Sequence, residues 1–179
     1  DALKLFLIYG PSFFQKLDDI ISYLFASSAN EVKLLKNIFG NKKVVLIDVG
    51  TNEGSYTDLI YKNFQIKKIY CFEPISKLCN KLKKKYPPNI LNIYNFPLSN
   101  KSTTRNFYEY SISSTSSLYK QNDLYKSLKK IKNVNKIKTY SFDKIFNKNE
   151  KIDICKIDVQ GEDFNVLKGM KKNLKKKNI

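Results

Sequence analysis

The sequence has no histidine, and it has only three cysteines in 179 residues. Without histidine, any general base must be an aspartate, glutamate, lysine, tyrosine or cysteine side chain. Cys71, Cys79 and Cys155 show no paired spacing. Because a structural zinc site needs four ligands, the sequence predicts no metal site of this kind. Free thiols are typical of a reducing compartment, which predicts a cytoplasmic protein.

Long hydrophobic runs are also missing. No apolar stretch approaches the roughly 18 residues that a membrane-spanning helix needs. The run LFLIY at residues 5–9 is too short for the core of a signal peptide, and no basic segment precedes it. We therefore expect no transmembrane segment, and the hydrophobic content of 42% predicts a globular chain with one main core.

Arginine is scarce, since Arg105 is the only arginine among 33 basic residues, although the formal net charge is +17. A surface that clamps phosphates or reads bases is expected to use more arginine, because guanidinium binds in a bidentate manner. Abundant lysine, asparagine and isoleucine together indicate coding bias and solvated faces. A nucleic-acid partner is therefore the less favoured interpretation, although a lysine-rich surface can attract anionic molecules. The sequence leaves the oligomeric state open.

Short apolar runs alternate with helical patterns along most of the chain. The predicted strands are 44–48, 68–73, 89–96 and 151–159. The predicted helices are 13–25, 30–40, 55–64, 74–86 and 162–177, the last with Leu167, Met170 and Leu174 facing inward. The remaining segments are 105–113, which resembles an exposed strand, 114–123, a polar loop, and 138–146, a short strand or turn entering a short helix.

The alternation of strands and helices predicts an α/β fold, with a mostly parallel sheet and helices on both faces. Residues 1–40 are expected to form a helical lead-in and residues 41–179 the ligand-binding domain. In such sheets, ligands bind beyond the carboxyl ends of the strands, where the strand order reverses.

The stretch VVLIDVGTNEGSYT at 44–57 places two of only six glycines directly after a buried strand. Gly50 can turn sharply out of the strand, and Gly54 can let the loop approach a ligand at the start of the next helix. A tight strand-to-helix turn without a ligand explains the glycines about equally well. GTNEG lacks the second glycine of the dinucleotide fingerprint GxGxxG, which disfavours a dehydrogenase. If the loop holds a ligand, Gly50→Val is expected to abolish binding and to spare most of the fold.

Acidic residues at the strand ends favour a ligand-binding loop over a tight turn without a ligand. Glu73 ends the second strand, where a carboxylate can accept both hydroxyls of a ribose. Asp48 closes the first strand and could hold an ammonium group or a loop N–H. Together they suit S-adenosylmethionine, a nucleoside with a carboxylate, an ammonium and a sulfonium but no phosphate. The alternative for Glu73 is a surface acid that caps the helix at Pro74.

Four motifs of the chain resemble, in order and spacing, those of the FkbM family of S-adenosylmethionine-dependent methyltransferases. They are VVLIDVGTNEGSYT, IYCFEP, NFPLSN and IDICKIDVQGEDFNVLKGM. The family's hallmark, K-I-D-V-E/Q-G-x-E before a helix ending in L-K-G, reads KIDVQGEDFNVLKG at 156–169. SSTSSL at 113–118 is similar to the serine-rich segment that the family carries before this motif. The resemblance covers about residues 40–172, and it implies a Rossmann-like class I methyltransferase fold.

The resemblance also implies a role for each matching residue. The methionine side of the cofactor site would be formed by Asp48, Gly50, Asn52 and Gly54. Glu73 would bind the ribose, residues from Asn95 to Leu98 would lie beside the adenine, and Asp158 would face the reactive methyl group. The family is linked mainly to O-methylation of sugars, glycans and other small-molecule hydroxyls, which implies an acceptor of that class.

Three acids follow the last predicted strand. An acid between Ile157 and Val159 needs a partner if it is buried, so we expect Asp158 to point into the cleft and to position or deprotonate the acceptor hydroxyl. Glu162 and Asp163 are explained by the first turn of a helix, where the macrodipole favours negative charge. A carboxylate-metal site with Glu162 is the less favoured alternative. Gln160 stands where many members of the family carry glutamate.

Members of this fold usually finish with three further strands, so the resemblance implies a chain that is incomplete at its C-terminus. The strand near 152–157 would then have an unpaired edge. The sequence leaves three hypotheses open: a methyltransferase acting on sugar or small-molecule hydroxyls, a nucleic-acid methyltransferase favoured only by the lysines, and a truncated domain without activity.

Overall fold

The computed structural model describes residues 29–121, 130–146, 150–176 and 179. Contacts divide the chain into two units, Asp1–Lys42 and Lys43–Ile179. In the first unit residues 29–39 are helical, as predicted, and Gly40 ends this helix by donating its N–H to the carbonyl of Lys36. Ile38 of this helix is exposed. The predicted helix at 13–25 lies outside the described residues.

The second unit contains a four-stranded parallel sheet with the order β3-β2-β1-β6. Its strands are β1 (Val44–Val49), β2 (Ile66–Phe72), β3 (Leu91–Tyr94) and β6 (Ile154–Ile157). A central strand of a sheet that is covered on both faces has no side open to solvent, and all six residues of β1 are buried. The predicted parallel α/β sheet is confirmed. Among the described strands, β6 forms one edge.

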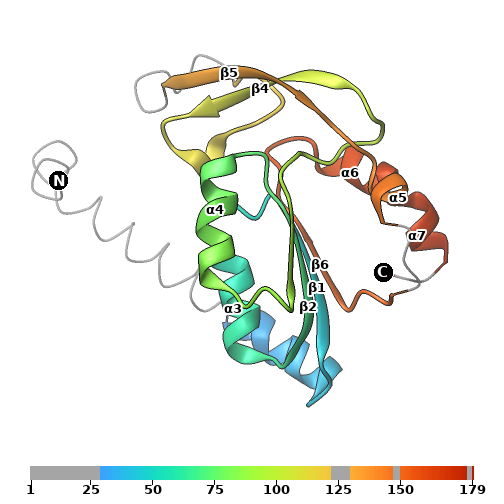
Figure 1. The fold of residues 1–179 in the computed structure, drawn as a ribbon. Coiled ribbons are helices and arrows are strands. Elements are labelled where there is room, and N and C mark those ends of the chain that lie inside the picture. Colours follow the sequence, from blue (N-terminus) through green and yellow to red (C-terminus); the bar gives the residue numbers. More distant parts are fainter. Residues whose placement is uncertain (1–28, 122–129, 147–149, 177–178) are drawn as a thin grey trace, which may run out of the picture. The chain divides into compact units, whose positions relative to one another are not determined.

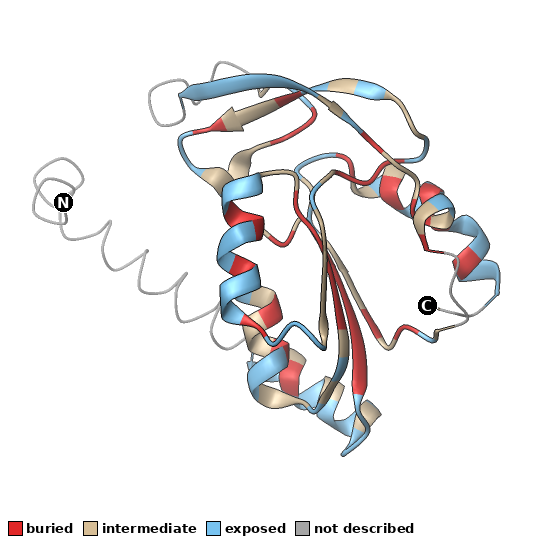
Figure 2. Cartoon of the chain, viewed as in Figure 1, coloured by how far each residue is buried: buried red, intermediate tan, exposed pale blue. Residues whose placement is uncertain are grey.

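Helices cover both faces of this sheet, as Figure 1 shows. One face is covered by α3 (Ser55–Asn63) and α4 (Ser76–Lys85). The other face is covered by α5 (Phe142–Ile145), α6 (Asp163–Gly169) and α7 (Lys171–Lys175). Side chains along a strand alternate between the two faces, so Val45, Ile47 and Val49 of β1 pack into one cluster with Phe142 and Met170. Figure 2 shows the resulting band of buried residues through the sheet.

The predicted helix at 162–177 is wrong as a single element, because α6 and α7 are separate. Leu167 and Leu174 are expected inside, but their side chains are exposed, and only Met170 of the three is buried. The physical reason is a capping interaction. The Asp143 carboxylate accepts hydrogen bonds from the backbone N–H groups of Lys172 and Asn173, and it thereby stabilises the start of a new helix.

A second, two-stranded antiparallel sheet is formed by β4 (Thr104–Tyr110) and β5 (Ile131–Lys138). The strand expected at 105–113 is therefore present, although Phe107 and Tyr110 are buried. Sequence patterns missed β5, since seven of its eight residues are exposed and the strand depends on backbone pairing with β4. The expected short helix within 138–146 is confirmed as α5, and a short 3₁₀ helix at Ser113–Thr115 lies between β4 and β5 in the chain.

Candidate functional site

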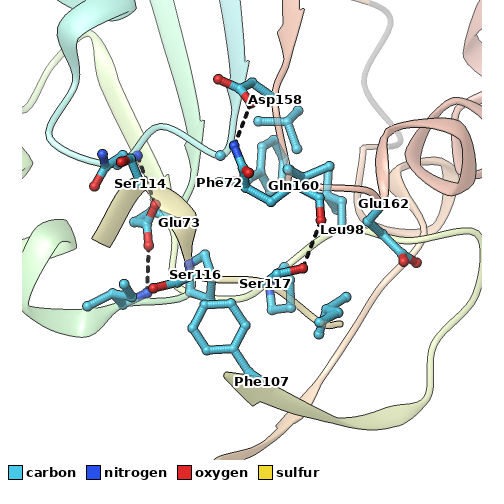
Figure 3. A pocket seen from close by; sticks show the side chains of 18 of the residues that line it. Phe72, Glu73, Leu98, Phe107, Ser114, Ser116, Ser117, Asp158, Gln160 and Glu162 are labelled. Carbon is cyan, nitrogen blue, oxygen red and sulfur yellow. Dashed lines mark hydrogen bonds between the residues drawn. The ribbon is translucent and has the colours of Figure 1, made fainter. Parts of the chain in front are cut away.

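A pocket opens beyond the carboxyl ends of β1, β2 and β6 (Figure 3). One part of it is lined by Phe72, Glu73, Leu98 and Asp158. The other part is lined by Phe107 and by residues of the serine-rich segment 113–118. Its volume is about 50 Å³, or about 540 Å³ when the space open to solvent is included, so the walls lie close together. The predicted ligand edge of the sheet is thus the place where the structure has a pocket.

Glu73 follows β2 directly and is buried at one end of the pocket. Its two carboxylate oxygens accept hydrogen bonds from the backbone N–H groups of Asn52 and Ile75, both at 2.8 Å. Burial raises the pKa of Glu73 to about 7, and these two hydrogen bonds oppose that rise. Each oxygen keeps a second lone pair, so the carboxylate can still accept hydroxyl groups from a ligand.

Gly50 lines the pocket, and a neighbouring loop leaves no room for a side chain on it. Gly50 has a positive φ of 77°, and a Cβ there would lie 2.1 Å from the carbonyl oxygen of Asp158. This contact contradicts the expectation that Gly50→Val spares the fold. A side chain at Gly50 forces the loops after β1 and β6 apart, so it disturbs the fold together with the pocket.

Gly54 is predicted to let the loop approach a ligand, and its observed contacts are different. It is the N-cap of α3 with φ of 86°, and a Cβ there would lie 2.7 Å from Leu82 and 3.0 Å from the Tyr86 hydroxyl. Leu82 belongs to α4, and Gly54 is not among the residues that line the pocket. Its small size therefore serves the packing of α3 against α4.

Asp48 lies at the end of β1 with its side chain fully buried. Its Oδ2 accepts a hydrogen bond of 2.7 Å from the Thr57 hydroxyl of α3, and its Oδ1 lies 3.4 Å from the Lys156 ammonium. Burial raises the pKa of Asp48, while Lys156 and Thr57 act in the opposite direction. Of the two partners that the sequence left open for Asp48, an ammonium group or a loop N–H, the structure shows an ammonium group, that of this chain's own Lys156, and Asp48 does not itself line the pocket.

Asp158 lines the pocket directly after β6, as Figure 3 shows. Its side chain is 59% exposed, so the condition under which it would need a buried partner is not met. The carboxylate lies 3.5 Å from the Lys156 ammonium and accepts a long hydrogen bond, 3.4 Å, from the Gln160 side chain. An exposed carboxylate at the pocket mouth is available to a second molecule that enters from solvent.

The two ends of the segment predicted to lie beside the adenine, Asn95 and Leu98, have different positions. Leu98 is buried and lines the pocket. Asn95 does not line it, because its amide donates to the backbone carbonyls of Glu73 and Pro74 and its carbonyl accepts from the Ser76 hydroxyl. Asn95 therefore holds the turn after Glu73 in place, and of the two only Leu98 has contact with the pocket.

Glu162 is predicted to be an acid in the first turn of a helix, but its side chain is only 1% exposed and lines the pocket. Its Oε1 accepts hydrogen bonds from the Ser99 hydroxyl at 2.6 Å and from the Arg105 guanidinium at 2.8 Å. The pair joins the start of α6 to β4, so it connects the covering helices of the parallel sheet with the second sheet. The single arginine of the chain was the available signal, and sequence spacing could not pair it with Glu162.

The serine-rich segment supplies contacts that the sequence did not predict. The Ser113 hydroxyl donates to the Asn52 side chain at 2.8 Å, and the Ser117 hydroxyl donates to the Gln160 carbonyl at 2.8 Å. This segment therefore touches the loop after β1 and the loop after β6. It is expected as a polar loop, yet Ser117 and Leu118 are buried.

No group of three or more histidine, cysteine, aspartate or glutamate side chains that could hold a metal ion occurs among the described residues. The residues present do fit a nucleoside carrying an amino-acid tail. Glu73 has lone pairs for ribose hydroxyls, Phe72 and Leu98 are apolar members of the pocket lining, and a charged cluster lies at the ends of β1 and β6.

The match to a known family agrees with this geometry. The sequence model of the methyltransferase FkbM domain matches residues 48–179. The chain therefore belongs to the FkbM methyltransferase family, as the motifs indicated. A comparison with curated proteins finds no match of significant similarity.

A solved structure supports the fold. The chain is similar to the crystal structure of methyltransferase FkbM from Methylobacillus flagellatus, with a TM-score of 0.50 and 12% sequence identity. The similarity covers 75% of this chain and 30% of that chain. At this identity the likeness shows the fold alone, which is the Rossmann-like fold expected from the sequence.

Proposed function

We propose that this protein transfers a methyl group from S-adenosylmethionine to a hydroxyl of a sugar, a glycan or another small molecule. The observation that carries the proposal is the pocket itself. It has a buried acid, Glu73, at the end of β2 and an exposed acid, Asp158, at the end of β6. The buried carboxylate of Glu73 can accept hydrogen bonds from ligand hydroxyls that are shielded from water, and the exposed carboxylate of Asp158 is accessible to an acceptor molecule.

The cofactor would be held by residues from two strand ends and one wall. Glu73 would accept the ribose hydroxyls, because an ionised carboxylate forms strong hydrogen bonds with such donors. Leu98 would lie against the base. Gly50 and Asn52 would shape the part of the site that holds the methionine moiety. Asp48 would act on this part only indirectly, through its ion pair with Lys156, and Gly54 would act through the packing of α3.

When bound, S-adenosylmethionine supplies a reactive methyl group on a sulfonium. The chain's own contribution is then alignment and removal of a proton. Asp158 would accept a hydrogen bond from the acceptor hydroxyl and would take up its proton on a carboxylate oxygen. No histidine exists to take this role.

A neutral, hydroxyl-bearing acceptor is favoured over nucleic acid by the character of the pocket wall. Four serines, Ser113, Ser114, Ser116 and Ser117, line it, and no lysine or arginine is among the described residues that do so. A nucleic-acid substrate is expected to be held through its phosphates by basic groups that face it, whereas Lys156 and Arg105, which contact lining residues, are each paired with a carboxylate.

The location of the protein is a separate part of the proposal. All three cysteines are free thiols, which is typical of a reducing compartment, and we therefore propose a cytoplasmic location. None of the described helices has the length and apolar character that crossing a bilayer requires.

Calorimetry with S-adenosylhomocysteine, the demethylated product, tests the cofactor assignment, and NAD serves as the matched nucleoside control. We expect binding of the former and no measurable binding of the latter. Absence of S-adenosylhomocysteine binding would contradict the proposal. Weak single-stranded RNA binding that does not change with salt would set aside the nucleic-acid alternative, whereas a steep salt dependence would favour it.

The role of Asp158 is tested by Asp158→Asn, which nearly preserves shape while it removes charge and basicity. Because the side chain is exposed, the substitution is expected to have little effect on folding. We expect retained S-adenosylhomocysteine binding and a loss of methyl transfer of about a hundredfold or more, measured with radiolabelled donor on a panel of sugars and small alcohols. Unchanged transfer to an accepted substrate would remove Asp158 from the mechanism.

A further inference from the structure

Lys156 occupies a position that none of the roles above uses directly. It belongs to β6, and in the parallel register it lies directly opposite Asp48 of β1. Its ammonium lies 3.4 Å from the Asp48 carboxylate, 3.5 Å from the Asp158 carboxylate and 3.2 Å from the carbonyl oxygen of Gly50. One cation thus contacts the ends of β1 and β6 at the edge of the pocket.

The environment of Lys156 differs from that of the chain's surface ion pairs. Its side chain is 20% exposed, compared with 58% for Lys67 and 56% for Lys81 in their pairs. Its partner Asp48 is fully buried, and the Lys156 ammonium lies 3.4 Å from Asp48 Oδ1. Charges in such a place are screened weakly, so they act on one another and on a neighbouring ligand over several ångströms.

We propose that Lys156 sets the charge of the methionine end of the site, and that it thereby limits the preference of the protein for the positively charged methyl donor over its neutral product. This proposal rests on the proposed function, since it places the sulfonium at the ends of β1 and β6. Lys156 acts here as a specificity-determining residue with a fixed positive charge between two carboxylates.

The physical reason is charge balance. Asp48 and Asp158 both attract a sulfonium, and Lys156 partly cancels this attraction. A sulfonium loses its charge when its methyl group leaves, so an environment that binds it too well raises the barrier to transfer. A cation beside two carboxylates keeps the attraction moderate, and it keeps the neutral product from being bound much more weakly than the donor.

The test compares the dissociation constants of S-adenosylmethionine and S-adenosylhomocysteine, measured by calorimetry at about pH 8. The two ligands share the same ribose, base, ammonium and carboxylate, so their ratio reports the charge and methyl group on sulfur. Lys156→Gln removes the positive charge but keeps a donor for the Gly50 carbonyl. We expect it to increase the preference for the donor by about three- to thirtyfold.

Asp158→Asn provides the opposite change on an exposed side chain, so it remains informative if the Lys156 variant does not fold. We expect it to lower the preference for the donor, and the double variant to return it towards that of the parent protein. Sinefungin carries an amine in place of the sulfonium methyl. In each variant, its affinity relative to S-adenosylhomocysteine is expected to shift in the same direction as that of S-adenosylmethionine.

Lys67→Gln is the matched control, because Lys67 has its own ion pair with Glu150 at 3.4 Å near the other end of β2. It should leave the ratio unchanged. If both ligands bind to the variants with the parent's ratio, Lys156 has only a structural role and the inference is wrong. If the parent protein binds neither ligand, the proposed function fails and the inference fails with it.

Discussion

Two buried glutamates stand on different sides of the pocket, and they are stabilised in different ways (Figure 3). Glu73 accepts backbone N–H groups from Asn52 and Ile75 and has no ion pair among the described residues. Glu162 accepts hydrogen bonds from Ser99 and from the charged guanidinium of Arg105. Burial alone would favour the neutral form of both carboxyl groups.

The two glutamates therefore have pKa values shifted in opposite directions. Burial raises the pKa of Glu73 to about 7. For Glu162, burial acts in the same direction, but hydrogen bonds from Ser99 and Arg105 outweigh it and hold the pKa below its usual value. A carboxylate with a cationic partner serves stability, whereas one without it keeps its remaining hydrogen-bonding capacity for a ligand.

The largest effect on stability is expected for Glu162→Ala. It removes an acceptor from Ser99 and leaves the Arg105 guanidinium without its carboxylate. Loss of one partner of a largely buried pair should lower the free energy of unfolding by about 2 to 4 kcal/mol, measured by urea denaturation. Glu53→Ala removes an exposed pair with Lys81 and is the control, with little change expected. Equal effects of the two substitutions would contradict this view of Glu162.

Glu73→Ala should show its main effect in ligand affinity. Loss of charge-assisted hydrogen bonds to ribose hydroxyls is expected to cost about 1.5 to 3 kcal/mol of binding free energy for S-adenosylhomocysteine. Glu109→Ala, on β4 and outside the pocket lining, is the control that should bind as the parent does. Parent-like affinity of Glu73→Ala would mean that the ribose site is misplaced.

The contributions of Glu73 and Glu162 to the free energy of unfolding are expected to change with pH in opposite directions. The folded pKa of Glu73 lies above its ordinary value of 4.5, so its contribution is fully present below that pH and is lost as the pH rises through about 7. The folded pKa of Glu162 lies below 4.5, so its contribution is present above that pH and is lost as the pH falls through the lowered pKa. Unfolding curves of parent, Glu73→Gln and Glu162→Gln from acid to mildly alkaline pH should show these opposite slopes.

The ionisation of Glu73 should also appear in binding. If the ionised carboxylate is the form that holds ribose hydroxyls, affinity for S-adenosylhomocysteine should rise by about tenfold from pH 6 to pH 8. Glu73→Gln should abolish this dependence, and Glu162→Gln, whose parent residue is already ionised in this range, should retain it. A pH-independent affinity of the parent protein would argue against a titrating Glu73 in the site.

The smallest effect is expected for Ser113→Ala, which removes the hydrogen bond to Asn52 across the pocket. Such a bond contributes about 0.5 to 1.5 kcal/mol, and part of this should appear as weaker cofactor binding because Asn52 also donates to Glu73. Ser102→Ala, outside the pocket lining, is a suitable control. A change in unfolding free energy without any change in affinity would limit Ser113 to a structural role.

Local sequence patterns were sufficient to predict the parallel sheet and the edge at which its pocket opens. The apolar runs of β1 and β2 lead into Asp48 and Glu73, and a glycine after a buried strand is a local turn signal. Such signals need no knowledge of distant residues. The motifs at 44–57 and 156–169 indicate the FkbM family for the same reason, because each is a contiguous run of the chain.

The surroundings of each of these residues depend on how distant segments pack. Sequence spacing could not bring Arg105 to Glu162 or Lys156 to Asp48, because these pairs meet only after strands and helices have packed. It also missed β5, since an exposed strand is stabilised by pairing with β4 and has no apolar pattern of its own. Burial and ion pairing are properties of the folded protein, and they shift the pKa values of Glu73 and Glu162 in opposite directions.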